Sequence, residues 1–443
     1  MGASRIIGYE FHISFFADLD KHCVLRGNET LERPLTSKEF EVLVFFLQHP
    51  HEVIARDKVE PLQDAYYARL PVDDYISKIC KKLEIEREEC FRTVRKVGYE
   101  LTIRVLPRFE AERQEAGHLF RASDIHFNQH TKASLDVALD QSKEVLTRHP
   151  EGFAESRISQ AYILIDLAHD VLSARLPSEC IPLARAEAEK ALATDERAAA
   201  FGVLGLIALI YDYDWSEAER LLNTAVELDP REASSLLTLA HLHISQGRRE
   251  EGLKAIERAV QANPLDQIIY ASWGWIYLLA GDAERAEHLG EQARLHFPLL
   301  PPAQVLLGQA YEANEKFDKA IESYKRALEL EVFPGVFAAL GHIHGRLGHR
   351  TKARFYLREI SRLHEDKKTA YVSGYCQALV HAGLGEQEEC LAALDRAYLQ
   401  RCDWLIHLGV EPRWSSVRHL SRFLELMRKV GVPDQSTKSA AQT

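Results

Sequence analysis

A cluster of basic and hydroxyl side chains between residues 77 and 96 is the strongest candidate in this sequence for a chemical role. From residue 78 to residue 96, seven Lys and Arg residues stand against four glutamates. Ammonium, guanidinium and hydroxyl groups donate hydrogen bonds to phosphate oxygens, so the cluster indicates contact with nucleic acid. The candidate DNA-binding residues are Ser77, Lys78, Lys81, Lys82, Arg92, Thr93, Arg95 and Lys96.

Two adjoining elements are expected to present these side chains. Residues 72–83 carry apolar side chains at positions 72, 76, 79 and 83, the spacing of a helix with one buried stripe. Residues 91–101 alternate apolar and polar side chains, with Gly98 where a hairpin could turn. The major groove admits one helix, and a cationic loop can reach the neighbouring phosphates or the minor groove. Double-stranded DNA is therefore the expected partner.

The same residues resemble the OmpR/PhoB-type winged-helix domain of bacterial transcription regulators. The family's recognition helix has the form D-x-x-I-x-x-L-R-x-K-L, and its wing has the form T-V-R-x-x-G-Y. The matching positions here are Asp73, Ile76, Ile79, Cys80, Lys82, Leu83, Thr93, Val94, Arg95, Gly98 and Tyr99.

The resemblance assigns roles to the candidate residues. It implies that Ser77 and the three lysines of the helix contact the groove and phosphates, that Thr93 binds phosphate, and that Arg95 with Lys96 forms a cationic wing. Cys80 stands where the family usually has arginine, Asp74 lies on the same helix, and Pro61 lies inside the expected second helix. Lysine in place of arginine predicts weaker bidentate reading of guanine and modest sequence specificity.

The elements before the recognition helix follow from local signals. Strands are expected near residues 11–13 and 23–26, with a hairpin turn at Gly27-Asn28. A helix should begin after Thr36 or Ser37 with help from Glu39, and should end at His49-Pro50. Its expected core stripe is Phe40, Leu43, Val44 and Leu47. A short second helix is expected at 56–62, followed by a loop at 63–71 that contains Tyr66 and Tyr67.

After residue 104, with Pro107 as the expected boundary, the sequence is organised by a repeat. Pro230, Pro264 and Pro298 lie 34 residues apart, and each follows a similar helical ending. Together with Trp273-Gly274-x2-Tyr277, these units resemble the tetratricopeptide repeat. Small residues such as Ala218, Ala320 and Ala353 should let two helices approach closely. Large residues such as Leu222 and Tyr324 should fill the groove to the next unit.

The expected fold is mainly α: an N-terminal α+β winged helix-turn-helix domain at 1–105, then an α-superhelix of helical hairpins at 110–430. About eight repeats are expected, with an insertion near residues 172–181 and a capping segment from Trp404 that ends in a helix at 417–430. Residues 433–443 read as a disordered tail. This domain order resembles HilA-like and CadC-like regulators, here without a transmembrane segment.

Other kinds of chemistry find little support. His241 with His243, and His342 with His344, are two positions apart and do not share a helical face, so packing is expected rather than metal binding. Asp212 and Asp214 suit a capped turn between helices. The seven cysteines include no C-x-x-C pair, which favours buried thiols. We expect no catalytic site, no metal and no cofactor.

The sequence therefore predicts a DNA-binding transcriptional regulator whose repeat array takes a protein or peptide in its groove and controls the wing domain. RNA polymerase and a second copy of the chain are further candidate partners. The alternative is an interaction scaffold whose wing domain no longer binds DNA. The net charge is −11, of which residues 1–104 contribute −2. Neither a signal peptide nor an apolar run long enough to cross a bilayer is recognisable, so a cytoplasmic location is expected.

Overall fold

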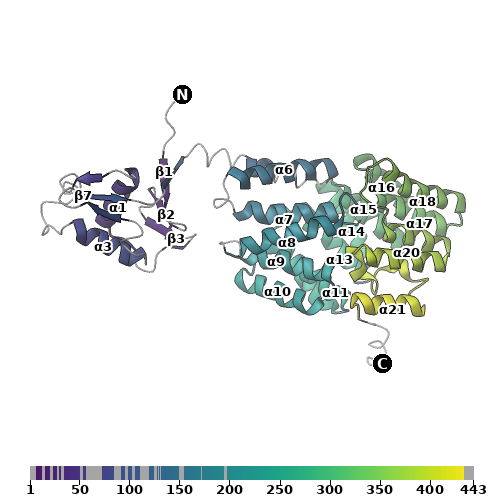
Figure 1. Ribbon diagram of the computed structural model, residues 1–443. Coiled ribbons are helices and arrows are strands. Elements are labelled where there is room, and N and C mark those ends of the chain that lie inside the picture. The colour runs from purple at the N-terminus through teal and green to yellow at the C-terminus, as the bar shows by residue number, and fades with distance from the viewer. Residues whose placement is uncertain are drawn as a thin grey trace. The chain divides into compact units, whose positions relative to one another are not determined.

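The computed structural model describes two compact units, residues 1–118 and 119–443 (Figure 1). The first unit contains two small antiparallel sheets and two described helices, and the second is an α-superhelix of helical hairpins. The described residues are 6–11, 15–19, 23–26, 29–30, 34–49, 53–55, 72–83, 91–94, 98–101, 105–109, 119–123, 127, 129, 131–148, 154–170, 172–193 and 197–433.

A five-stranded antiparallel sheet runs in the order β4-β3-β2-β1-β8. Its strands are β1 (Ile6–Phe11), β2 (Phe15–Asp18), β3 (Cys23–Arg26), β4 (Glu29–Thr30) and β8 (Val105–Phe109). Arg26 pairs with Glu29, which confirms the hairpin expected there. Short strands are expected from Ile6 onward, and β1 begins at that residue. Of the strand expected at 11–13, Phe11 ends β1, and residues 12 and 13 lie outside the described residues.

Pro107 does not end the N-terminal fold, which corrects the expectation from sequence. It lies inside β8, where its backbone is opposite Tyr9 of β1. Proline cannot donate a ladder hydrogen bond, but β8 is an edge strand, where one side of the backbone needs no partner. A chain segment nearly 100 residues from β1 therefore closes the first sheet.

The second half of this unit is a helical layer with a three-stranded sheet of order β5-β7-β6. Helix α1 (Ser37–Gln48) starts with a capping box, in which Thr36 and Glu39 each accept the other's backbone N–H, as expected. Phe40, Leu43 and Leu47 are buried, and Val44 is half-buried. The remaining elements are α3 (Val72–Leu83), β5 (Val53–Ala55), β6 (Phe91–Val94) and β7 (Gly98–Leu101). The expected second helix and the loop with Tyr66 and Tyr67 lie outside the described residues.

The second unit begins with α6 (Lys132–Arg148) and continues as seven helical hairpins. Their helices are α7 (Ala154–Ala168) with α8 (Pro177–Ala191), α9 (Arg197–Ile207) with α10 (Trp215–Leu228), α11 (Ala233–Ser245) with α12 (Arg249–Ala262), α13 (Gln267–Leu279) with α14 (Ala283–His296), α15 (Pro301–Ala313) with α16 (Phe317–Leu330), α17 (Pro334–Arg346) with α18 (Arg350–Glu365), and α19 (Gly374–Leu384) with α20 (Gln387–Leu399). None of the described helices is both long and apolar enough to cross a membrane.

Two irregular features interrupt the regular pairing. A π-helical turn, η2 (Ala208–Asp212), extends α9. After α20 come two short 3-10 turns, η3 (Asp403–His407) and η4 (Pro412–Trp414), and then α21 (Ser421–Val430). The final helix, expected from residue 417, starts later because Val417 is buried in the turn that follows η4.

In two of the hairpins, a glycine on the first helix packs directly against a large side chain on the second. A Cβ on Gly308 would lie 2.6 Å from the ring of Tyr324, and one on Gly205 would lie 2.7 Å from Leu222. Each of these contacts joins the two helices of one hairpin. Tyr324 also shares a hydrophobic cluster with Val336 and Leu340 of the next hairpin, as expected for a residue that fills the groove to the next unit. Ala218, Ala320 and Ala353 are each fully buried.

Candidate functional site

Helix α3 presents one buried face to the N-terminal core. Ile76, Ile79, Cys80 and Leu83 follow the i, i+3, i+4, i+7 pattern, and each is at most 3 % exposed. The expected stripe at 76, 79 and 83 is confirmed. Cys80 belongs to this buried face, so its thiol packs in the core rather than facing solvent.

The opposite face of α3 is a polar stripe with the same periodicity. Asp74, Ser77, Lys78 and Lys81 are all exposed and lie at i, i+3, i+4 and i+7. Lys78 and Lys81 therefore project from the same side of the helix, as a groove-binding face requires. Asp74 shares this side one turn closer to the helix start.

Lys82 is held inside the domain. Its ammonium group donates to the carboxylate of Glu39 at 2.6 Å and to the carbonyl of Pro34 at 3.0 Å. Partial burial alone would raise the pKa of Glu39, but hydrogen bonds from Lys82 and Thr36 lower it. Because Glu39 also caps α1, Lys82 fixes the position of α3 relative to the start of α1.

The hairpin β6–β7 follows α3 and is anchored on α1. Phe91 of β6 meets Phe46 edge to face, with ring centroids 5.3 Å apart. In the ladder, Arg92 is opposite Glu100, and Thr93 is opposite Tyr99. Both candidate residues are therefore on the strand that leads to the wing turn. Arg95 and Lys96 lie outside the described residues.

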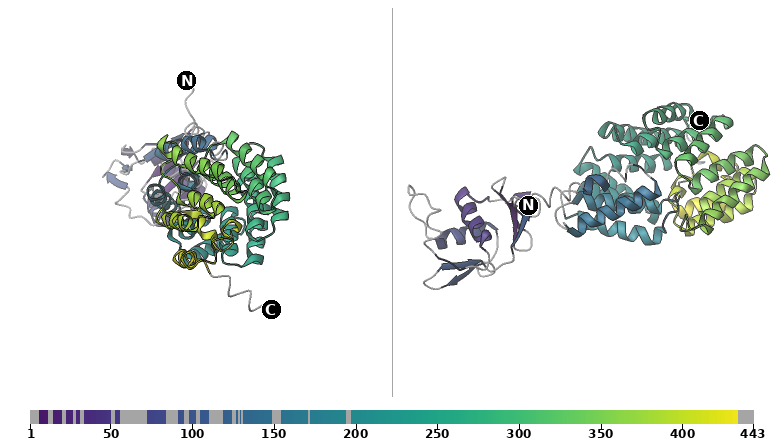
Figure 2. Two further views of the ribbon diagram at one scale, coloured as in Figure 1. Left: turned by 90° about the vertical axis from the view of Figure 1, so that its right-hand side faces the viewer. Right: turned by 90° about the horizontal axis from the view of Figure 1, so that it is seen from above.

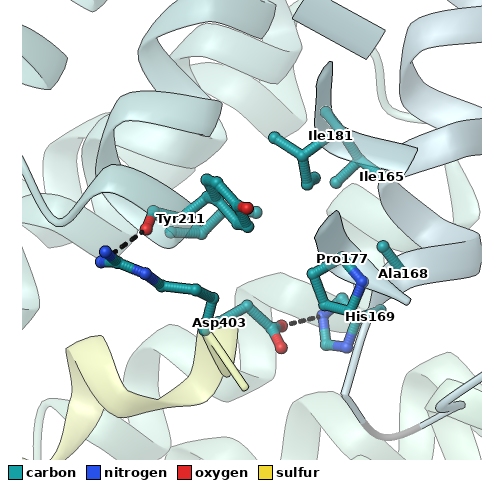
Figure 3. Close-up of a pocket in the computed structure, with 9 residues that line it drawn as sticks. Ile165, Ala168, His169, Pro177, Ile181, Tyr211 and Asp403 are labelled. Atoms are coloured by element: carbon teal, nitrogen blue, oxygen red, sulfur yellow. Dashed lines mark hydrogen bonds and ion pairs between the residues drawn. The ribbon is translucent and has the colours of Figure 1, made fainter. Parts of the chain in front are cut away.

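In the second unit, the C-terminal segment (residues 369–432) folds back onto the first hairpins. The imidazole Nε2 of His169 donates to Asp403 at 2.7 Å (Figure 3). The backbone N–H of Asp170 donates to the same carboxylate at 3.0 Å. The carboxylate of Asp170 accepts from the hydroxyls of Ser373 and Tyr371. We call these five residues the clasp: His169, Asp170, Tyr371, Ser373 and Asp403.

Two clasp residues, His169 and Asp170, have shifted pKa values. Burial and the nearby charge of Asp403 raise the pKa of Asp170 to about 6. Burial alone would lower the pKa of His169, but the charge and hydrogen bond of Asp403 raise it. The His169 imidazolium is therefore favoured beside Asp403.

Further contacts extend along the same face of the array. Tyr213, whose left-handed backbone (φ 57°) ends η2, donates to the carbonyl of Cys402 at 2.7 Å. The indole of Trp215 donates to the carbonyl of Val430 at 2.7 Å. Figures 1 and 2 show the corresponding arrangement, with α21, in yellow, beside the teal helices α10 and α11. The π-helical turn thus places aromatic groups where the C-terminal segment passes.

The next two hairpins contribute the inner part of this contact. Ser245 of α11 is 2.8 Å from Nδ1 of His407, and His241 lies 5.1 Å from the same ring. Trp275 of α13 meets Trp404 edge to face at 6.1 Å. Burial lowers the pKa of His241 to about 4, and burial with the nearby His241 lowers that of His407. Both imidazoles are therefore neutral parts of a packed interior.

A small pocket lies beside the clasp (Figure 3). Its volume is about 10 Å³, the space of about one water molecule. Small-molecule sites are typically about 300 Å³ or larger, so this pocket does not suit a cofactor. Its lining residues are Ile165, Ala168, His169, Pro177, Ile181, Ile210, Tyr211, Arg401 and Asp403.

Comparison with family models decides the domain types. Residues 30–101 match the model described as transcriptional regulatory protein, C terminal. Residues 209–272 and 301–331 match models of the tetratricopeptide repeat. The chain carries an OmpR/PhoB-type winged-helix domain followed by tetratricopeptide repeats.

Individual relatives are distant. Anaphase-promoting complex subunit 3 of Schizosaccharomyces pombe is 24 % identical over 116 residues, which are 26 % of this chain and 17 % of the relative. The solved Cut9–Hcn1 hetero-tetramer of the APC/C aligns with a TM-score of 0.47 and 16 % identity over 73 % of this chain and 57 % of that one. Pseudomonas aeruginosa pilF aligns with a TM-score of 0.35 and 15 % identity, over 48 % of this chain and 92 % of its own.

Several residues that the sequence singled out have structural roles in the repeat array. Asp214 caps α10 by accepting from the backbone of Glu217 at 3.0 Å, as expected for that turn. Asp212 pairs with Arg185 at 2.7 Å. His342 is buried, with Nδ1 2.5 Å from Glu312, which fits the expected packing role. No group of three or more potential metal ligands comes together among the described residues.

The sequence did not reveal the clasp. The irregular connection between α7 and α8 and the departure from the repeat after α20 were visible signals, and these two segments contain His169, Asp170 and Asp403 of the clasp. Their pairing was not visible, because more than 200 residues separate them. Through these contacts, the C-terminal segment covers part of the hairpins from α7 to α13.

Proposed function

We propose that this chain is a bacterial DNA-binding transcriptional regulator that acts by binding, without catalysis of its own. The exposed stripe of α3 enters the major groove with Ser77, Lys78 and Lys81 toward bases and phosphates. Arg92, Thr93, Arg95 and Lys96 bring the wing to the neighbouring backbone. Lys82 supports this contact by holding α3 against α1.

The observation that supports the proposal best is the division of α3 into two faces. One face is buried against the domain, and the other displays hydroxyl and ammonium groups. A helix that serves only to stabilise the domain needs only the buried face. In a domain of the transcriptional-regulator type, the second face suits a duplex.

The repeat array supplies the regulatory half of the proposal. Repeat arrays offer extended surfaces to protein partners. We propose that a protein or peptide partner binds the array and controls the use of the winged-helix domain, in the cytoplasm where chromosomal DNA lies. RNA polymerase and a second copy of the chain are the partners to examine alongside it.

Titration of the full chain with duplex DNA at several salt concentrations tests the DNA-binding function. A reader with about five phosphate contacts gives a slope of log affinity against log salt of roughly −4 to −5. Replacing Lys78 and Lys81 with glutamine should reduce this slope by about 2, since each contact contributes about 0.9. The matched control replaces the exposed Lys254 of α12 with glutamine and should leave the slope unchanged.

Absence of a salt-dependent duplex interaction would reject the proposal. It would favour the alternative, an interaction scaffold with a degenerate winged-helix domain. Two features favour this alternative. Asp74 lies on the exposed stripe of α3, and Lys82 pairs with Glu39 inside the domain.

A further inference from the structure

The inner surface of the array is partly occupied by the chain itself. Between α7 and α13, the C-terminal segment contacts the array through the clasp, Tyr213, Trp215, Ser245 and Trp275. Trp414, Phe423 and Val430 in that segment are fully buried. Removing it would expose a large apolar area, so this surface is part of the core. A partner must therefore find a surface elsewhere on the array.

The outer face of α18 has the properties of such a surface. Lys352, Phe355 and Arg358 follow one another at intervals of three residues, so they share one side of the helix. Phe355 is 46 % exposed, although large apolar side chains on most of this array are buried. An exposed ring thus lies between two exposed cations, one turn away on each side.

The charges on this face are not neutralised within the described part of the chain. Neither Lys352 nor Arg358 makes an ion pair there. Other cations of the same helix do, since Arg350 and Arg354 share the carboxylate of Glu386 at 2.8 and 2.6 Å. The unneutralised cations therefore lie on the same side as the exposed ring.

The opposite side of α18 packs against His344 of α17. Burial, together with the charges of Lys352, His349 and Lys325 of α16, lowers the pKa of His344. The ring of His344 stacks on Tyr356 at 5.8 Å and 4°. We define the α18 patch as Lys352, Phe355 and Arg358.

We propose that the α18 patch docks an acidic segment of a partner protein that carries apolar side chains. The cations match carboxylates, and the exposed benzyl group of Phe355 provides an apolar contact between them. Proteins that bind single-stranded nucleic acid stack successive bases on several exposed aromatic rings. Here, Tyr356 and Phe337 are partly buried against the array, and Phe355 alone in the patch projects outward. These features favour an acidic protein segment over single-stranded nucleic acid.

The charge distribution of the whole chain adds to this argument. The net charge is −11, and residues after position 104 carry −9 of it. A local cationic face on an acidic array stands out in its electrostatic potential and steers an acidic partner to one place. The inference rests on the proposed role of the array in protein interaction, and it names the chemistry of the partner.

Fluorescence anisotropy on the full chain tests the inference directly. The probe is a labelled synthetic peptide of aspartates and glutamates with leucines at helical spacing. One control peptide replaces the acids with their amides, and a second replaces the leucines with serines. The native chain should bind the first peptide at least tenfold more tightly than either control.

Variants then locate the interaction. The pair Lys352→Glu with Arg358→Glu should weaken binding at least tenfold, and Phe355→Ser about fivefold. The effect of Phe355→Ser should persist at high salt, because an apolar contact is not screened. The matched control, Lys254→Glu with Arg258→Glu on α12, should keep native affinity. Unchanged tryptophan fluorescence of each variant shows that the array is folded.

Three results would overturn the inference. The patch variants keep full affinity for the acidic peptide, the α12 control loses as much affinity as they do, or a labelled single-stranded oligonucleotide binds in their place with the same dependence on the patch. Duplex titration of the same variants separates this test from the DNA-binding proposal. The α18 variants should retain native duplex affinity, whereas variants of Lys78 and Lys81 should lose it and still bind the peptide.

Discussion

The imidazole of His169 donates to the carboxylate of Asp403 at 2.7 Å and joins the second repeat region to the segment that follows the last hairpin (Figure 3). Repeat arrays are usually stabilised by contacts between neighbours only. Here, the beginning and end of the array share one hydrophobic cluster, which extends from Leu135 to Val432. The array should therefore fold and unfold as one unit.

Replacing Asp170 with asparagine should change how the stability of the array depends on pH. Its pKa is raised from 3.8 to about 6, so between these values the folded chain holds a proton that the unfolded chain releases. The free energy of unfolding contributed by this group falls as pH rises, by at most about 1.4 kcal/mol per pH unit. Asparagine does not titrate, so the variant does not lose this stability as pH rises. The free energy of unfolding of the variant minus that of the native chain should therefore increase by about 1 to 2 kcal/mol from pH 5 to pH 7.5.

Urea unfolding followed by tryptophan fluorescence measures this effect. All five tryptophans lie in the second unit, so the signal reports on the array alone. His241 and His407 titrate in both proteins, and their contributions cancel in the difference. His169 adds to the effect of Asp170 in the same direction, because the Asp170 carboxylate also raises the pKa of that imidazole. Parallel stability curves for the two proteins across this pH range would show that Asp170 is not the group involved.

Truncating Trp414 to alanine should weaken helices far from the substitution. Trp414 is fully buried and packs against Tyr375 and Phe423, with ring centroids 5.3 and 6.3 Å away. Loss of so large a side chain costs about 3 to 5 kcal/mol. Because the C-terminal segment also contacts η2 and α11, hydrogen exchange should accelerate in α9 to α11 as well as in α19 to α21.

The control for that experiment is Leu265→Ala, since Leu265 is 83 % exposed and its loss should be nearly neutral. Faster exchange restricted to the last hairpin and α21 would mean that the contact between the C-terminal segment and the first hairpins contributes little to the stability of the array.

The contact between Gly205 and Leu222 predicts strong energetic coupling inside one hairpin. A methyl group on Gly205 would lie 2.7 Å from Leu222 Cγ, so Gly205→Ala alone should cost about 1 to 3 kcal/mol through overpacking. Leu222→Ala alone should cost about 2 to 5 kcal/mol through the cavity it creates. The double variant should cost at least about 1 kcal/mol less than the sum, because the new methyl group occupies part of that cavity.

Chemical denaturation of the four proteins gives the coupling energy. Gly205→Ala combined with Leu265→Ala serves as the reference pair and should be additive. Additivity in the Gly205 and Leu222 pair as well would contradict the direct packing described above.

Substitutions of Lys82 and Lys81 should have different effects, the first on the stability of the winged-helix domain and the second on its affinity for DNA. Lys82→Met leaves the buried carboxylate of Glu39 without its cation and should destabilise the winged-helix domain by about 1 to 3 kcal/mol. The lowered pKa of Glu39 means that this stabilisation is present above pH of about 4.3 and is lost as pH falls further. Lys81→Met should leave stability unchanged and reduce the salt slope of DNA binding by about 0.9.

Hydrogen exchange in α1 and α3 reports the stability of this domain, and duplex titration reports affinity. A loss of stability in Lys81→Met equal to that in Lys82→Met would refute the division of roles between the two lysines.

Local signals in the sequence predicted much of the architecture. The capping box of Thr36 and Glu39 spans three residues, and the faces of α3 follow from a period of 3.6, so both are visible in a short window. The repeat was visible because the spacing of Pro230, Pro264 and Pro298 is regular. Short-range order of this kind identified the fold class and the side of α3 that faces solvent.

Contacts between distant positions could not be read in this way. Lys82 and Glu39 are 43 residues apart, and nothing in the helical pattern distinguishes this lysine from Lys81. The pairing of β8 with β1 places Pro107 at a sheet edge, where proline is tolerated, and sequence alone does not show which strands are at an edge. The clasp depends on the curvature accumulated over six hairpins, which no single repeat encodes.

The return of the C-terminal segment to the first hairpins also orders events during synthesis. A ribosome adds about 5 to 20 residues per second, so Asp403 follows His169 after roughly 10 to 50 seconds. Once His241 and Trp275 have been made, the nascent chain displays them and the apolar surface around them without their covering until the C-terminal segment follows. Ribosome-associated chaperones should therefore engage this chain between the emergence of α13 and that of α21.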